Sequence, residues 1–241
     1  MAKSSRSKRR AAARPAVRAS GSNRDKAVKE LAVDALMALL AEKPFEQIGL
    51  AEVAERAGLK LSELRAEFGS TLAMLAAHIR ETDRKVLDAG DLKMDEDPPR
   101  ERLFEVLMRR LEVLAPYKDA VRSLMRSASR NPGLALALNT MGVRSQTWML
   151  TAAGIGTNGP RGALRAQGAA LMFARVASVW VDDDEPGLDR TLAALDRGLA
   201  SAERWSGFVD DLCCIPAVLC RGLPRGRRAR RFDRGVEADA A

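Results

Sequence analysis

Side chains able to perform acid–base or metal chemistry are few and scattered in this sequence. The one histidine, His78, stands in an apolar helical pattern between Ala77 and Ile79, where a packed imidazole is expected rather than a general base. The three cysteines all lie near the end of the chain, at Cys213, Cys214 and Cys220. No second Cys/His cluster, Ser/His/Asp set or Gly-rich phosphate loop stands at usable spacing. The sequence therefore predicts a protein that is not an enzyme and that holds no metal and no cofactor.

Positive charge is concentrated at the two ends of the chain. Residues 1–26 carry nine Lys or Arg against Asp25 alone, and residues 221–234 carry seven Arg against Asp233. The remaining body is mildly acidic, although the whole chain has a formal charge of +8. We expect a disordered basic arm over 1–24 and a flexible basic tail over 207–241, which either stay solvated or hold phosphates or anionic lipid.

The composition favours helices. Aromatic residues make up only 4% of the chain, and the apolar residues are mainly Ala, Leu and Met, which are stronger helix formers than strand formers. No apolar stretch approaches the roughly 20 residues of a membrane-spanning helix, so a cytoplasmic location is expected. The sequence GDLKMDEDPP interrupts the helical pattern and predicts a boundary between a small domain, 25–90, and a larger helical bundle, 98–206. The predicted fold class is all-α.

Apolar spacing within the first domain predicts four helices. The first runs from Asp25 to Pro44, a short one ends at Gly58, another short one begins at Leu61 or Ser62, and the fourth begins after Ser70. Glycine at position 58 suits a left-handed residue in a tight corner between two helices.

The segment IGLAEVAERAGLKLSELRAEFGSTLAMLAAHI resembles the helix-turn-helix domain of TetR-family transcriptional regulators. The resemblance covers about 50 residues and includes these scaffold positions: Ala54, Ala57, Gly58, Leu59, Leu64, Phe68, Gly69, Ser70 and Leu75. It implies that the third helix enters the major groove of double-stranded DNA. The DNA contacts expected on this basis are Lys60, Leu61, Ser62, Glu63, Arg65, Ala66 and Thr71, with Arg24 and Lys26 added from the arm.

The same helix departs from the family at its contact positions. Arg65 and Glu67 replace two aromatic residues, and Thr71 replaces a phosphate-binding Lys. Glu63 and Glu67 repel phosphates, although a Glu can also accept a hydrogen bond from the amino group of cytosine. Two interpretations follow: the module binds DNA with help from its arm, or it is a helix-turn-helix kept only for packing.

The second half of the chain predicts further helices over 118–129, 132–152, 161–181 and 187–205. The TetR resemblance implies a homodimer formed by the last two of these helices and a bundle that binds a small apolar effector. The effector pocket is predicted at Tyr117, Met125, Met141 and Trp148, and the dimer interface at Phe173, Val176, Trp180, Leu192 and Leu195. The alternative is that these side chains form the core of one subunit.

Two segments of the same half, LEVLAPYKDAVRSL and the run from Trp180 through VDDDEPGLDRTLAALDRGL, resemble the accessory lipid-binding family of ubiquinone biosynthesis, which has a TetR-like fold without DNA binding. In addition, LCCIPAVLC followed by RGLPRGRRARR places an apolar stretch beside a cationic one, which suits peripheral lipid contact or ordinary packing of the tail.

The sequence thus predicts a homodimeric repressor released by a small apolar effector. Its alternatives are a lipid-binding accessory protein and an interaction protein without either ligand.

Overall fold

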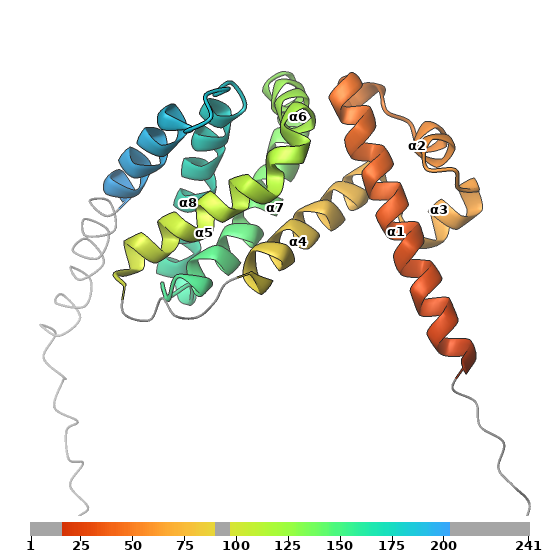
Figure 1. Cartoon of the computed structure of the whole chain (residues 1–241), viewed down its shortest axis with the longest axis horizontal. Helices are drawn as coiled ribbons and strands as arrows, with labels where there is room; N and C mark the ends of the chain where they lie inside the picture. Colours follow the sequence, from red (N-terminus) through yellow and green to blue (C-terminus); the bar gives the residue numbers. More distant parts are fainter. Residues whose placement is uncertain (1–15, 90–96, 203–241) are drawn as a thin grey trace, which may run out of the picture. The chain divides into compact units, whose positions relative to one another are not determined.

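The structure is a computed structural model that describes residues 16–89 and 97–202, and every regular element in these ranges is a helix (Figure 1). Residues 16–89 and 97–202 belong to one compact unit. The main helices are α1 (Ala16–Glu42), α2 (Leu50–Arg56), α3 (Leu61–Glu67), α4 (Thr71–Asp88), α5 (Pro99–Leu114), α6 (Lys118–Arg130), α7 (Pro132–Ala152) and α8 (Gly159–Trp180). Short 3-10 turns, η1 (Phe45–Gln47) and η3 (Ala115–Tyr117), precede α2 and α6, and residues 189–202 are also helical. The all-α prediction is confirmed.

Helix α1 begins earlier than the sequence pattern predicted. It starts at Ala16 rather than near Asp25, so the predicted disordered arm over 1–24 is wrong for residues 16–24. The extension, AVRASGSNR, lacks the regular apolar spacing from which the start of the helix was predicted, so the sequence pattern did not include it. Residues 1–15 and the predicted basic tail lie outside the described residues.

Two polar side chains fix where later helices begin. The Ser70 hydroxyl accepts a hydrogen bond of 3.1 Å from the backbone N–H of Ala73 at the start of α4. The Asn131 side-chain oxygen accepts one of the same length from Leu134 N–H at the start of α7. Each cap satisfies a donor that has no partner within the first turn of a helix.

The apolar core consists of two clusters. The first surrounds Leu36, Leu40, Val53, Leu64 and Leu75 of the first four helices, and it also contains side chains from α6 and α7. The second joins α5, α7 and α8 to residues 189–202. Because α6 and α7 contribute to the first cluster, the helix-turn-helix packs directly on the bundle. The predicted boundary near residues 90–98 stays a prediction.

A buried ion pair connects α4 to the bundle. Arg110 of α5 pairs with Asp83 of α4, and each residue is less than 10% exposed. The Ser145 hydroxyl donates to the same Asp83 oxygen at 2.7 Å, and the Arg110 guanidinium carbon lies 5.2 Å from the centre of the Phe173 ring. A buried charge is tolerable only when it is paired and hydrogen-bonded in this way.

Among the described residues, no helix combines the length and the apolar character that crossing a membrane requires.

Candidate nucleic-acid interface

Helices α2 and α3 meet at a tight corner. Gly58 has a φ of +65°, a conformation that side chains disfavour, and its N–H donates to Glu55 O at 3.1 Å. The next N–H, of Leu59, reaches back to Ala54 O at 2.9 Å. The two helices are anchored to α1 by Val53 and Leu64, which are at most 1% exposed. Burial of this side of α3 leaves its other side facing solvent.

The exposed side of α3 carries most of the predicted DNA contacts. Lys60, Leu61, Ser62, Arg65 and Ala66 are exposed, with Leu61 at 55%. Thr71, at the start of α4, is half-buried. Lys60 and Arg65 have no ion-pair partner within the part of the chain that the structure describes. The structure therefore places the predicted contact residues of α3 on one accessible surface with two uncompensated bases.

Glu63 is held by two neighbours. One of its carboxylate oxygens accepts a hydrogen bond from the backbone N–H of Lys60 at 3.0 Å, and the other lies 2.8 Å from Nη2 of Arg24. The Lys60 N–H first, and then the Arg24 guanidinium, lower the pKa of Glu63 below its usual value. Glu63 thus both closes the first turn of α3 and binds a base of α1.

Glu67 has a base of its own at the other end of α3. Its carboxylate lies 3.0 Å from Nζ of Lys29, which is also on α1. Lys26, predicted to contact DNA, lies 3.8 Å from Glu30 on the following turn of α1. Sequence reasoning missed Lys29 because a pairing across 38 residues leaves no local pattern.

The far end of α1 is fastened to α2. Glu42 makes a two-pronged pair with Arg56, each bond 2.8 Å long, and Lys43 pairs with Glu52. The first pair lowers the pKa of Glu42, chiefly through its hydrogen bond to Arg56. Four ion pairs therefore hold α2 and α3 against α1 and the residue that follows it, and they compensate the charges of Glu52, Glu63 and Glu67.

Comparison with known structures identifies this arrangement. A TetR transcriptional regulator from Nitrosomonas europaea ATCC 19718 superimposes with a TM-score of 0.57 at 21% sequence identity, over 73% of this chain and 97% of its own length. The chain has a TetR-like fold. A TetR transcriptional regulator from Rhodococcus sp. RHA1 matches with a TM-score of 0.51 at 19% identity, over 73% of this chain and 96% of its own. No protein-family model matches the sequence, and no curated protein matches it significantly.

The residues predicted to line an effector pocket in the TetR-like bundle differ in burial and in their neighbours. Tyr117 is half-buried, with its ring edge-on to His78 at 4.7 Å between centres. Met125 packs against the second core cluster, and Met141 is half-buried on α7. Trp148 is 59% exposed, so its prediction as an interior pocket residue is wrong. The reason is that α7 turns this side chain outward, away from buried Met149.

The predicted dimer residues are largely internal. Val176, Trp180 and Leu195 are at most 2% exposed and belong to the second core cluster, while Phe173 and Leu192 are half-buried. For the three buried residues, the dimer prediction is wrong because Val176 and Trp180 of α8 and Leu195 of residues 189–202 are covered within one chain, in the same core cluster. Leu164 and Leu171 of α8 are instead exposed by 52% and 53%.

Proposed function

We propose that this chain is a DNA-binding transcriptional regulator whose helix α3 enters the major groove. The observation that carries the proposal is that α3 presents Lys60, Ser62 and Arg65 to solvent while its two acids are paired with bases of α1. A phosphate approaching the module therefore meets neutralised pairs and two uncompensated bases, rather than two bare carboxylates.

The side chains of α3 suit base recognition as well as phosphate contact. Glu63, at the start of the helix, can accept a hydrogen bond from the amino group of cytosine once DNA phosphates attract Arg24. Leu61 offers an apolar surface for the methyl group of thymine, and Arg65 suits either guanine or a phosphate. This combination predicts sequence-specific binding with an operator that contains cytosine or thymine at the contacted positions.

We also propose that the protein acts as a homodimer on a pseudo-palindromic site, since one α3 reads only a few base pairs. The exposed Leu164 and Leu171 stand seven residues apart on α8 and therefore lie on one side of it. Exposed Trp148 adds a third large apolar side chain on α7, the helix that packs along α8. Large apolar groups in contact with water favour a protein partner.

We further propose that the protein represses transcription and that a small apolar effector releases it from DNA. Half-buried Tyr117, Met125 and Met141 are the side chains proposed to contact the effector. A ligand among them would act on α4, because Tyr117 contacts His78 of that helix. Helix α4 follows α3 in the chain and packs against the bundle, so its movement would also move α3.

The test is a fluorescence-anisotropy titration of the full chain with labelled DNA from upstream of its own gene, at low and at moderate salt. We expect specific binding, and we expect Lys60→Ala with Arg65→Ala to weaken it at least tenfold and to flatten its salt dependence. The matched control is Arg80→Ala with Arg197→Ala, which removes two exposed arginines from α4 and from residues 189–202. Absence of binding to any upstream fragment at low salt would contradict the proposal.

A further inference from the structure

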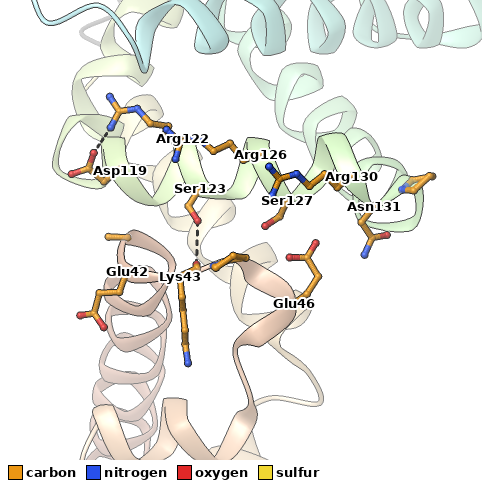
Figure 2. A pocket seen from close by; sticks show the side chains of 13 residues that line it. Glu42, Lys43, Glu46, Asp119, Arg122, Ser123, Arg126, Ser127, Arg130 and Asn131 are labelled. Atoms are coloured by element: carbon orange, nitrogen blue, oxygen red, sulfur yellow. Dashed lines mark hydrogen bonds and ion pairs between the residues drawn. The ribbon is translucent and has the colours of Figure 1, made fainter.

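A groove separates the end of α1 from helix α6. It encloses about 690 Å³ and is lined on one side by Ala41 to Glu46 and on the other by α6 from Asp119 onward (Figure 2). Figure 2 shows Arg122, Arg126 and Arg130 following one another along α6, with Glu42, Lys43 and Glu46 across from them. The volume is within the range of small-molecule sites, about 300–1,000 Å³.

Most charges around this groove already have partners. Glu42 binds Arg56, Lys43 binds Glu52, and Arg122 binds Asp119, Asp182 and the carbonyl of Val181. Arg126 and Arg130 are exposed, and neither has an ion-pair partner among the described residues. Glu46, on the opposite side, is the remaining charged group of the lining and is likewise without an ion pair in this part of the chain.

The two arginines stand four residues apart, which places them on the same side of α6 with about 6 Å between their β-carbons. Two guanidinium groups at this spacing can hold one phosphate from two directions, each through paired N–H donors. Their combined charge of +2 matches a phosphate monoester, which carries about −1.5 to −2 at neutral pH. The side-chain NH2 group of Asn131 supplies a further hydrogen-bond donor on the same lining, since only its oxygen is used to cap α7.

We propose that this groove is a binding site for a small phosphorylated molecule, with Arg126 and Arg130 as its phosphate-binding residues. The carboxylate of Glu46 lies on the facing side and opposes the anion, so it limits affinity. A ligand larger than phosphate alone is expected, because the groove exceeds the volume of one phosphate group and carries apolar surface from Ala41 and the two prolines, Pro44 and Pro132.

The site is linked to the helix-turn-helix by short contacts. Ser123 of α6 donates to the carbonyl of Lys43 at 3.1 Å, and Phe45 N–H donates to the Ser127 hydroxyl at 3.1 Å. The Lys43 ammonium in turn binds Glu52 of α2. An anion drawn onto α6 therefore acts on the segment that positions α2. This regulatory consequence rests on the proposed DNA binding, whereas occupancy of the groove does not.

The experiment measures thermal unfolding of the full chain without DNA, while inorganic phosphate is titrated against chloride at constant ionic strength. Binding to the native state raises the unfolding temperature in a saturable way. We expect Arg126→Gln with Arg130→Gln to raise the half-saturating phosphate concentration at least tenfold and Glu46→Gln to lower it. The control, Arg144→Gln with Arg175→Gln, makes the same charge change on exposed parts of α7 and α8 and should leave it unchanged.

The outcomes are decisive either way. The site is overturned if phosphate gives no saturable effect, if both double variants respond alike, or if acetate at equal ionic strength gives the same effect as phosphate. Because no DNA is present, a negative result here leaves the DNA-binding proposal standing, and failure to bind DNA leaves this site standing.

Discussion

The Arg24 guanidinium lies 2.8 Å from the Glu63 carboxylate, although 39 residues separate the two in sequence. The pair joins the N-terminal part of α1 to the start of α3. Arg24 keeps 75% of its side chain exposed, so the pair is solvated and adds little to the free energy of unfolding. In the proposed DNA binding the pair matters electrostatically, because it compensates the Glu63 charge that would repel phosphates and occupies the Arg24 charge that would attract them.

Replacing Glu63 by Gln releases Arg24 and removes one negative charge from the side of α3 that is proposed to face DNA. We expect affinity for non-specific DNA to rise several-fold and the slope of log K against log salt to steepen by about one phosphate contact. Anisotropy titrations between low and moderate salt measure both quantities. Glu55→Gln, on the exposed side of α2 and without a described ion pair, serves as the control. Equal gains in the two variants would contradict the role of the Arg24 pair.

Leu171→Glu tests the proposed dimer. A carboxylate at the centre of an apolar interface has no partner and would convert the dimer to monomers at micromolar concentration. Sedimentation velocity gives the mass directly. Leu31→Glu, on α1, introduces the same change at a position that is also about half exposed, and the dimer should survive it. An unchanged dimer in Leu171→Glu would remove this side of α8 from the interface.

Asp83→Asn should destabilise the protein strongly, because it leaves the Arg110 charge buried without its counter-ion. The expected loss is about 3–5 kcal/mol. The double variant Asp83→Asn with Arg110→Met should lose clearly less than the sum of the single changes, since it removes both charges. Urea unfolding followed by circular dichroism measures these values. Asp88→Asn breaks an exposed pair with Arg84 and should cost less than about 1 kcal/mol.

His78 predicts a pH dependence of stability. Burial, with smaller contributions from Lys85 and Arg110 and opposed by Glu81, lowers its pKa from 6.5 to about 4. Below pH 6.5 the unfolded chain binds a proton that the native imidazole resists, so stability is full above this pH and declines as pH falls towards 4. The loss reaches at most about 3 kcal/mol.

The measurement compares urea unfolding of the wild type and His78→Phe at several pH values. An aromatic ring at this position keeps the edge contact with Tyr117 and cannot titrate. The difference in unfolding free energy between the two proteins should shift in favour of the variant as pH falls from 6.5 to 4. A constant difference across this range would show that His78 is not responsible.

The helices were predictable from sequence because apolar spacing and end signals such as Gly and Ser act within a few residues of each helix. Apolar spacing located α1 to α4, Gly58 marked the corner, and Ser70 caps the helix whose start it predicted. The contact positions on α3 came from the TetR resemblance, and the structure leaves Lys60, Leu61 and Arg65 exposed.

The site's electrostatics was not predictable in this way. From the sequence alone, Glu63 and Glu67 are two unpaired acids that would repel phosphates. Only the packing of α1 against α3 brings Arg24 and Lys29 next to them. The dimer residues failed for a related reason, since Val176 and Trp180 have the composition of any covered apolar surface. Sequence spacing tells which side of a helix is covered but not whether the cover belongs to the same chain.

Helix α1 carries the Arg24 pair near one end and the groove-lining Lys43 just beyond the other. At 1.5 Å per residue these positions are about 28 Å apart along one uninterrupted rod. A helix of this length acts as a lever. If its axis rotates by a few degrees at the groove, the Arg24 end moves by about an ångström or more. Insertion of one residue within α1 would rotate its two ends by about 100° relative to each other, so the helix can tolerate changes in side chains far better than changes in register.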